Sequence, residues 1–426
     1  RLEHGEAFYP RVCDAIAAAS DEILLETFIW REDRVGRQLQ EKLVAAAQRG
    51  VVVEVLVDGY GTPGFSVEFL REMEAAGVQV DSFDPQPTLL RIRTNFLCRM
   101  HRKIVIVDSR IAFVGGINFS TVHLWDDGDD SMQDYAVEVQ GPVVRRIHEF
   151  WRKGAEAHEA PLWRRWRYWL RRFPREMMLP SKDAQVLFVY RDNEQHPTDI
   201  ETMYRIGIRA AKDSIVIACA YFFPGYRFVR DLRGAVDRGV DVTLIMQGKP
   251  DQPFKVGAAS ILFDDLLSMG VRIFLYEERG LHAKVAAIDR HWSTVGSSNL
   301  DPSSLGLNLE ANLFILDEPF NAELRQSLER LLEECCRELT PESAPKRSLL
   351  RRMGTLGFNM LLKLLFRSSV SGCSQICGIS ESAADVPTSE EEPMAQTVGD
   401  YLLARLRHRG AAHEGARDRL LEGDRG

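Results

Sequence analysis

Short runs of apolar, mostly β-branched residues alternate along the first 340 residues with longer segments in which apolar positions recur every three or four residues. The runs at 51–57 (VVVEVLV) and 103–107 (KIVIV) are almost continuously apolar, as expected for strands buried on both faces. The segments 36–50 and 226–239 have the helical period. This alternation predicts an α/β fold in which helices flank mixed β-sheets.

The order of these elements occurs twice. Asp21, Gly50 and Gly77 lie in the strings SDEILLETFIW, RGVVVEVLVDG and AGVQVDSF, and similar strings follow around Asp213, Gly239 and Gly270. The three pairs are offset by 192, 189 and 193 positions. Two unrelated α/β domains would not give nearly constant offsets. The sequence therefore predicts two duplicated domains, each a mixed sheet flanked by helices, packed about a pseudo-twofold axis.

Composition divides the chain into four segments. We expect the first repeat at 1–154 and the second at 181–340. Between them, 155–180 is a linker rich in Arg and Trp, and 341–426 is a tail with Ser-, Glu- and Pro-rich stretches. The tail lacks the apolar content of a packed core, so we expect it to be largely disordered, although short helices could form in it.

Charge and cysteine content narrow the function classes. The chain has 54 Lys and Arg against 62 Asp and Glu, a net charge of −8, which disfavours nucleic acid as a partner. Its seven cysteines show neither a disulfide framework nor a zinc spacing, which favours a reducing compartment. The most apolar stretch, 355–366, is interrupted by Asn359 and Lys363, so no membrane span is predicted. Nor does the sequence predict a metal or another cofactor.

A doubled motif carries the candidate chemistry. Around residue 101 the chain reads MHRKIVIVDSRIAFVGGINFS, and around residue 282 it reads LHAKVAAIDRHWSTVGSSNLD. Both fit H-x-K-x-x-x-x-D followed by G-[GS]-x-N, and every matched pair is offset by 181 positions. The matched residues are His101, Lys103, Asp108, Gly115 and Asn118 in the first copy and His282, Lys284, Asp289, Gly296 and Asn299 in the second.

The spacing of the motif suits an anion. In an extended strand, His101 and Lys103 project to the same side and Arg102 to the other. A hairpin return would bring Asn118 back beside them as a neutral donor. Two such half-sites facing each other would place imidazoles, ammonium groups and amides around one phosphate. We therefore expect Asn118 and Asn299 to bind phosphate.

Two histidines allow phosphoryl transfer without a metal. One imidazole can attack phosphorus while the other protonates the leaving alkoxide, and the roles reverse in the second step. The attacking imidazole needs a carboxylate on its other nitrogen to orient it. Asp134 and Glu310, downstream of the two motifs, are the candidates. Glu26, at the end of the first strand, could line the pocket.

The paired motifs resemble those of the phospholipase D superfamily. The strings LETFIW, LVDGYG, TNFLCRMHRKIVIVD and WSTVGSSNLDPSSLGLNLEAN, with the central Arg- and Trp-rich segment, resemble bacterial cardiolipin synthases of the B type, over about residues 1–340. The resemblance implies a phosphohistidine intermediate on His101, with His282 as acid and base. It also implies that Asp108 and Asp289, which we group with the catalytic set, support the motif rather than touch substrate.

The leading hypothesis is therefore a cardiolipin synthase that transfers a phosphatidyl group between phosphatidylglycerol molecules and releases glycerol. Alternatives are a phospholipase D, in which water is the acceptor, and a phosphatidyltransferase that uses glycerol or phosphatidylethanolamine. A nuclease is less favoured because of the acidic net charge. A non-catalytic membrane scaffold is less favoured because both histidines and both lysines are present.

The linker suggests how the chain would reach a lipid substrate. Trp163, Trp166 and Trp169 form a stripe at helical spacing, and arginines occupy much of the remaining surface. Tryptophan favours the headgroup level, and each arginine near an anionic surface is worth about 1 kcal/mol. The alternative is a helix that packs its tryptophans on one of the repeats. We expect contact with an anionic bilayer, as a peripheral protein on the cytoplasmic face of the bacterial inner membrane.

Overall fold

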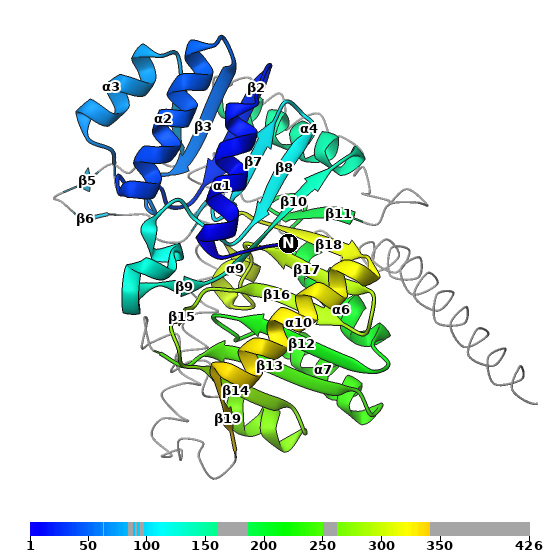
Figure 1. Ribbon diagram of the computed structural model, residues 1–426. Helices are drawn as coiled ribbons and strands as arrows, with labels where there is room; N and C mark the ends of the chain where they lie inside the picture. The colour runs from blue at the N-terminus through cyan, green and yellow to red at the C-terminus, as the bar shows by residue number, and fades with distance from the viewer. Residues whose placement is uncertain are drawn as a thin grey trace, which may run out of the picture.

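The chain folds into two similar α/β halves, one above the other in Figure 1. The structure is a computed structural model, and it describes residues 1–62, 64–83, 88–89, 92–93, 98–159, 186–249 and 262–340. Residues 160–180 of the predicted linker at 155–180, with its three tryptophans, and the tail from 341 onward lie outside the described residues.

The first half contains a sheet with the strand order β1-β10-β8-β7-β2-β3-β4. Its strands β2, β3 and β4 are parallel and the others pair antiparallel. The strands are β1 (Leu2–Glu3), β2 (Glu22–Thr27), β3 (Val52–Asp58), β4 (Gln79–Phe83), β7 (Ile104–Val107), β8 (Ile111–Gly115) and β10 (Tyr135–Gln140). A separate short pair is formed by β5 (Thr88–Leu89) and β6 (Ile92–Arg93).

The second half repeats this plan in the order β11-β18-β17-β16-β12-β13-β14-β19. Here β12, β13 and β14 are the parallel strands. The strands are β11 (Val186–Arg191), β12 (Ser214–Cys219), β13 (Asp241–Gln247), β14 (Arg272–Tyr276), β16 (Lys284–Ile288), β17 (Trp292–Gly296), β18 (Glu310–Leu316) and β19 (Cys336–Leu339). The predicted fold class, two duplicated domains with mixed sheets, is confirmed.

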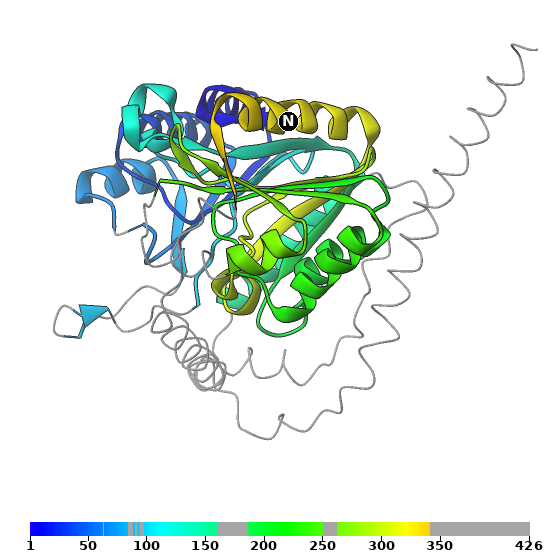
Figure 2. The same ribbon diagram turned by 90° about the horizontal axis from the view of Figure 1, so that it is seen from below.

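Helices flank both sheets. Those of the first half are α1 (His4–Ala17), α2 (Arg34–Gln48), α3 (Val67–Ala75) and α4 (Pro142–Glu159), with the 3₁₀ turns η1 (Thr121–His123) and η2 (Trp125–Asp130). Those of the second half include α6 (Asp199–Ala210), α7 (Tyr226–Asp237), α9 (Pro302–Gly306) and α10 (Glu318–Glu334). From below, the strands of the second half lie between α10 and the green helices of the same half (Figure 2).

Local sequence sets the ends of these helices. The Asp33 carboxylate accepts hydrogen bonds from the backbone N–H groups of Val35 and Gly36, each at 3.0 Å, and so begins α2. After α2 and α7 the chain turns through Gly50 and Gly239, with φ of 92° and 87°. That left-handed conformation suits glycine and ends each helix at equivalent places in the two halves.

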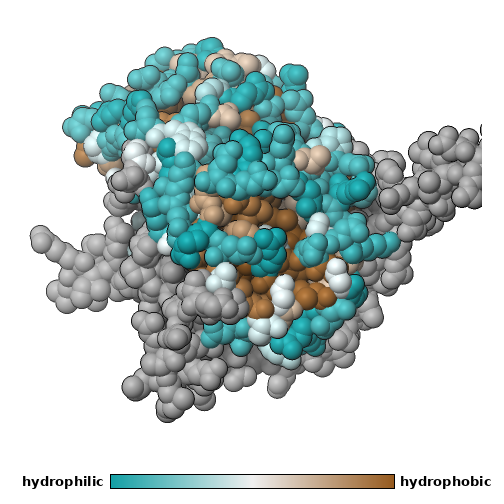
Figure 3. Space-filling view, turned by 60° about the horizontal axis from the view of Figure 1, so that its bottom comes forward, coloured by the Kyte–Doolittle hydropathy of each residue, from teal (hydrophilic) through white to brown (hydrophobic). Residues whose placement is uncertain are grey.

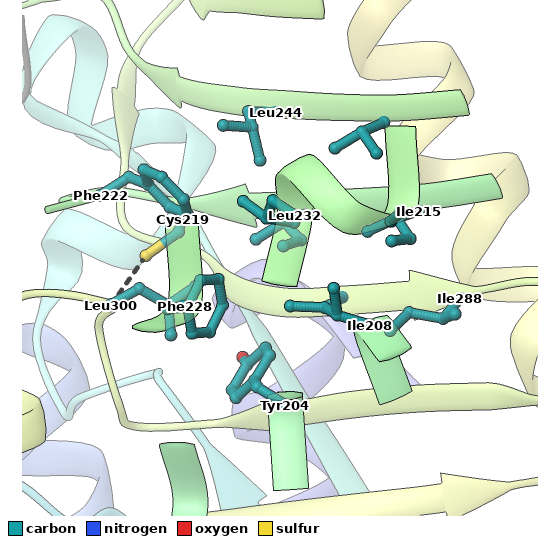
Figure 4. Close-up of a cluster of buried hydrophobic side chains, with 14 of the residues drawn as sticks. Tyr204, Ile208, Ile215, Cys219, Phe222, Phe228, Leu232, Leu244, Ile288 and Leu300 are labelled. Carbon is teal, nitrogen blue, oxygen red and sulfur yellow. Dashed lines mark hydrogen bonds between the residues drawn. The ribbon is translucent and has the colours of Figure 1, made fainter. Parts of the chain in front are cut away.

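Three apolar clusters form the core. One packs the first sheet against α1, α2 and α3, and another packs the second sheet against α6 and α7. Figure 4 shows the second cluster, in which the Phe228 ring lies 6.0 Å from the Tyr204 ring and the Cys219 thiol accepts a hydrogen bond from the backbone N–H of Leu300. The third cluster lies between the two sheets, with α4 and α10, and joins the halves.

Two short backbone pairings also join the halves. Strand β9 (Met132–Gln133) of the first half pairs in parallel with β15 (Gly280–Leu281) of the second. Met100 forms an isolated parallel bridge with Leu309. Both pairings lie next to a motif histidine, so each histidine is held by backbone from the other half.

The surface is hydrophilic over most of the face shown in Figure 3, and hydrophobic residues gather in one region near its middle. Within the described ranges, no helix combines the length and apolarity needed to cross a membrane.

Candidate active site

The two motifs begin equivalent antiparallel hairpins. Strands β7 and β8 pair with Ile104 opposite Val114, and β16 and β17 pair with Val285 opposite Val295. His101 and His282 immediately precede these hairpins. The backbone N–H of His101 donates to the carbonyl of Leu309, and that of His282 donates to the carbonyl of Gln133, each at 2.9 Å.

Side chains alternate along this segment as predicted. The His101 ring lies 4.9 Å from the Phe28 ring, and the Lys103 ammonium lies 5.1 Å from the same ring. Arg102 instead forms a buried ion pair with Glu26, at 2.9 Å. The expectation that Glu26 could line the pocket is therefore wrong, because its carboxylate is engaged by the guanidinium on the other side of the strand.

Glu310 orients the His101 imidazole. The Nδ1 atom of His101 lies 3.1 Å from a Glu310 carboxylate oxygen and 3.1 Å from the Ser297 carbonyl. A carbonyl oxygen only accepts, so Nδ1 must carry the hydrogen. In the neutral ring this leaves the lone pair on Nε2, the atom that could attack phosphorus.

Asp134 holds His282 in the same way. The Nδ1 atom of His282 lies 2.6 Å from a carboxylate oxygen of Asp134, whose other oxygen accepts from the backbone N–H of Tyr135. Asp134 and Glu310 occupy equivalent places, each two residues before the residue that pairs with Gly115 or Gly296. Each carboxylate thus serves the histidine of the other repeat.

A glycine makes room for the first carboxylate. A Cβ atom on Gly116 would lie 2.4 Å from the Asp134 carboxylate. The equivalent position in the second copy is Ser297, whose hydroxyl donates to Glu310 at 2.5 Å. The G-[GS] position of the motif therefore shapes the pocket for the carboxylate in both copies.

Burial and neighbouring charges set the ionisation of His101, Glu310 and Asp134. Burial, helped by Lys103 and Lys284, lowers the pKa of His101 despite the opposing effect of Glu310. Burial acts to raise the pKa of Glu310, but His101 and Lys103 outweigh it and the pKa is lowered. Neutral His101 next to ionised Glu310 is therefore the favoured state at pH 7. For Asp134, burial prevails and the pKa is raised.

The two lysines lie beside the histidines. The Lys103 ammonium donates to the His101 carbonyl at 2.7 Å, and Lys284 donates to the His282 carbonyl. Burial lowers the pKa of Lys103 to about 7, and the neighbouring charge of Lys284 acts in the same direction. Both side chains are almost fully buried, so an anion that enters the site would meet cations with little hydration of their own.

The two asparagines follow β8 and β17. The Asn118 side-chain oxygen accepts from the backbone N–H of Ile29 at 3.1 Å, which leaves its NH₂ group as a donor. Asn299 is 5% exposed, and its side-chain oxygen is buried without a hydrogen-bond partner among the described residues.

Asp108 and Asp289 lie at the other ends of β7 and β16. Asp108 follows His101 by seven positions, or about 23 Å of extended chain. Both aspartates have left-handed backbones, with φ of 52° and 47°. The Asp108 carboxylate accepts from the backbone N–H groups of Ser20, Asp21 and Glu22, and Asp289 accepts from those of 212–214. These residues anchor the strands, and the structure places them away from the histidines.

His123, on η1, is a member of the site that the motif search missed. Its ring lies 5.6 Å from the His282 ring, and its Nε2 accepts from the backbone N–H of Asn118 at 3.3 Å. Burial lowers the pKa of His123 to about 3, so the ring is neutral. Its Nδ1 must therefore carry the hydrogen, and this atom has no hydrogen-bond partner in the described part of the chain.

His123, Asp134 and His282 could together hold a transition metal. Their ligand atoms all lie within 4.8 Å of one another. The sequence shows no metal-binding motif for these three residues, because they come from both repeats. An ion there would have to displace the proton that His282 shares with Asp134.

Comparisons with known proteins identify the family of the chain. A family model described as "Cardiolipin synthase, PLD-like domain" matches residues 12–152 and 204–332. Cardiolipin synthase B of Shigella flexneri and that of Escherichia coli strain K12 are each 50% identical to the chain over 347 residues, 82% of this chain and 83% of each relative. Cardiolipin synthase A of Pseudomonas aeruginosa strain LESB58 is 32% identical over 84% of this chain and 71% of that protein.

Solved structures share the fold at low sequence identity. The phosphatidylserine synthase of Haemophilus influenzae Rd KW20 superimposes with a TM-score of 0.59 at 16% identity, over 84% of this chain and 92% of that one. A polyphosphate kinase from Porphyromonas gingivalis gives a TM-score of 0.53 at 16% identity, over 85% of this chain and 51% of that one. The family match and the 50% identity to cardiolipin synthase B show that the chain belongs to the cardiolipin synthase family, which has the PLD-like domain of the phospholipase D superfamily.

Proposed function

We propose that the chain is a phosphatidyltransferase that makes cardiolipin from two molecules of phosphatidylglycerol and releases glycerol. The observation that carries the proposal is the arrangement of His101 and His282, each held at Nδ1 by a carboxylate of the other repeat. The 50% identity to cardiolipin synthase B supports the choice of reaction.

In the first step, Nε2 of His101 attacks the phosphorus atom of phosphatidylglycerol. The bond from phosphorus to the glycerol oxygen breaks, and His282 gives that oxygen a proton from its Nε2. The phosphatidyl group is then bound to His101. Because Glu310 stays ionised, it can stabilise the positive charge that develops on the His101 ring.

In the second step, His282 removes a proton from the hydroxyl of a second phosphatidylglycerol. That oxygen attacks phosphorus and the bond to His101 breaks, which gives cardiolipin and restores both histidines. Lys103 and Lys284, with the amides of Asn118 and Asn299, would hold the charged oxygens of both transition states. If water replaces the lipid hydroxyl, the same residues perform phospholipase D hydrolysis.

We further propose that the protein works as a peripheral protein on an anionic bilayer, at the cytoplasmic face of the inner membrane. The Trp163, Trp166 and Trp169 stripe is the proposed contact. Replacing all three by Ala should weaken sedimentation with phosphatidylglycerol vesicles and preserve activity on short-chain soluble lipid. Unchanged vesicle binding would assign the contact to another segment.

The proposed reaction is tested with vesicles of defined phosphatidylglycerol and mass analysis of the lipid products. We expect cardiolipin and glycerol in equal amounts from the wild-type chain. Phosphatidic acid as the main product would show that water is the preferred acceptor. No turnover of any phospholipid would contradict the proposal.

A further inference from the structure

The two halves of the site differ at two neighbouring pairs of equivalent positions, Asp58 and Gln247, and Arg99 and Gly280. Asp58, the last residue of β3, accepts from the backbone N–H of Met100 at 2.8 Å. Gln247, the last residue of β13, accepts from the backbone N–H of Leu281 at 3.0 Å. These two contacts show that Asp58 is equivalent to Gln247, and Met100 to Leu281, in the two repeats. The residue just before Met100 is Arg99, whereas the residue just before Leu281 is Gly280.

The first repeat therefore has a cation and an anion, Arg99 and Asp58, where the second repeat has the neutral residues Gly280 and Gln247. The Arg99 side chain is 6% exposed, and its guanidinium lies 3.7 Å from the fully buried carboxylate of Asp58. It also lies 5.4 Å from the centre of the Tyr60 ring, and Tyr60 is 38% exposed. The guanidinium is thus near both a buried carboxylate and an aromatic residue that reaches the surface.

Arg99 is also close to the reacting groups. The backbone around it is extended, because the Arg99 carbonyl and the His101 N–H both bond to Leu309. Alternate residues of an extended chain project to one side at a spacing of about 6.6 Å, so Arg99 precedes His101 and Lys103 in one row. Asp58 is among the charges that act on the pKa of Lys103, which places the Arg99–Asp58 pair within electrostatic reach of the site.

The proposed reaction needs a second anion site. Cardiolipin carries two phosphodiesters joined by a single glycerol, so the phosphate of the acceptor lipid must lie one glycerol away from the phosphate being transferred. The paired histidines and lysines surround the transferred phosphate. A second phosphodiester brought this close is repelled by the first and loses hydration, so it needs a cation of its own.

We propose that Arg99 binds the phosphodiester of the acceptor lipid, one glycerol away from the phosphate that is transferred. A guanidinium can pair with a phosphate through two parallel N–H bonds, and the adjacent Asp58 carboxylate fixes its orientation. Arg99 would thereby favour a phosphate-bearing alcohol over water or free glycerol. This inference rests on the proposed function and adds to it the basis of acceptor choice.

The test compares two acceptors for one donor. Phosphatidylglycerol vesicles are incubated with labelled glycerol, and two products are measured: labelled phosphatidylglycerol, from a neutral acceptor, and cardiolipin, from an anionic one. Both share the step in which His101 attacks. The ratio of cardiolipin to labelled phosphatidylglycerol is compared among wild type, Arg99→Lys, Arg99→Gln and the control Arg110→Gln, an exposed arginine in the turn after β7.

We expect Arg99→Gln to lower the ratio by about ten- to a hundredfold, the usual range for loss of a hydrogen bond to a charged group. Arg99→Lys should lower it less, because it keeps the charge without the paired geometry, and Arg110→Gln should leave it unchanged. The reverse reaction, cardiolipin with glycerol, should slow in the same order as the ratio falls.

An unchanged ratio in both Arg99 variants would overturn the inference, and so would an equal loss of both products in Arg99→Gln. If Arg99→Gln does not fold, Arg99→Lys decides the test alone, and a wild-type ratio in it would overturn the inference. Failure of the proposed function gives a different result, in which the wild-type chain forms neither product.

Discussion

The Nδ1 atom of His101 lies 3.1 Å from a carboxylate oxygen of Glu310, a residue 209 positions further along the chain. His282 and Asp134 form the converse contact at 2.6 Å. Each histidine is therefore positioned by the repeat that does not contain it. Neither repeat contains both a motif histidine and the carboxylate that orients it. The two repeats are therefore needed together to form each half of the site.

Removal of one orienting carboxylate should impair catalysis more than folding. Glu310→Gln keeps the shape of the side chain but cannot stabilise a charged His101 ring. We expect kcat to fall by about 10²- to 10⁴-fold. Asp134→Asn should act similarly through His282. The measurement is steady-state cardiolipin formation, with thermal unfolding as the control. Near wild-type kcat in either folded variant would contradict the positioning roles.

The lowered pKa of Lys103 predicts a pH dependence. Only the protonated ammonium stabilises bound phosphate, and burial lowers the pKa of Lys103 to about 7. The free enzyme therefore loses this charge as the pH rises through about 7, and kcat/KM should fall above that value. Lys103→Arg stays charged and should move the alkaline limb upward, whatever its maximal rate. A kcat/KM that stays level between pH 7 and 9 would be inconsistent with this assignment.

The His123, Asp134 and His282 group predicts opposite effects of chelation and zinc. The two-histidine mechanism uses no metal, so EDTA should leave turnover unchanged. Added Zn²⁺ should inhibit, because it would compete for the Nδ1 atom of His282. His123→Gln should weaken this inhibition relative to its own zinc-free rate. Loss of activity in EDTA that a divalent ion restores would refute the metal-free mechanism.

Asp108 should matter for stability. Its carboxylate accepts from three successive backbone N–H groups, so Asp108→Ala should destabilise the fold by about 1–2 kcal/mol, as loss of a helix cap does. Asp108→Asn should cost less, because asparagine accepts hydrogen bonds and tolerates the left-handed backbone. Thermal unfolding measures both. If Asp108→Ala abolishes turnover without changing the unfolding temperature, the residue acts in catalysis directly.

The features of this molecule that depend on local periodicity could be predicted from the sequence. Alternation along a strand placed His101 and Lys103 on one side and Arg102 on the other, and the structure has this arrangement. The constant offset between the motifs predicted the duplication. Asp134 and Glu310 were found as candidates because each lies downstream of a motif.

The remainder depends on contacts between the repeats. Each carboxylate reaches the histidine of the other repeat because β9 pairs with β15 and Met100 pairs with Leu309. No pattern within either repeat specifies these pairings. His123 belongs to no motif and joins the site through η1. Arg99 has no counterpart in the second copy, so a search for repeated residues passes over it. The 163–169 stripe lies outside the described residues and stays a prediction.

The most direct test of the account is detection of the covalent intermediate. His282→Ala removes both the acid of the first step and the base of the second. With a donor whose leaving group departs without a proton, such as a phosphatidyl ester of p-nitrophenol, the first step should proceed while the second slows, so the phosphatidyl group should accumulate on the protein. After a short incubation with this donor, labelled in its phosphatidyl group, acid-labile label should appear in the peptide that contains His101, as identified by mass spectrometry. The control His101→Ala should carry none. Label on another residue, or wild-type cardiolipin formation by His101→Ala, would contradict the two-histidine mechanism.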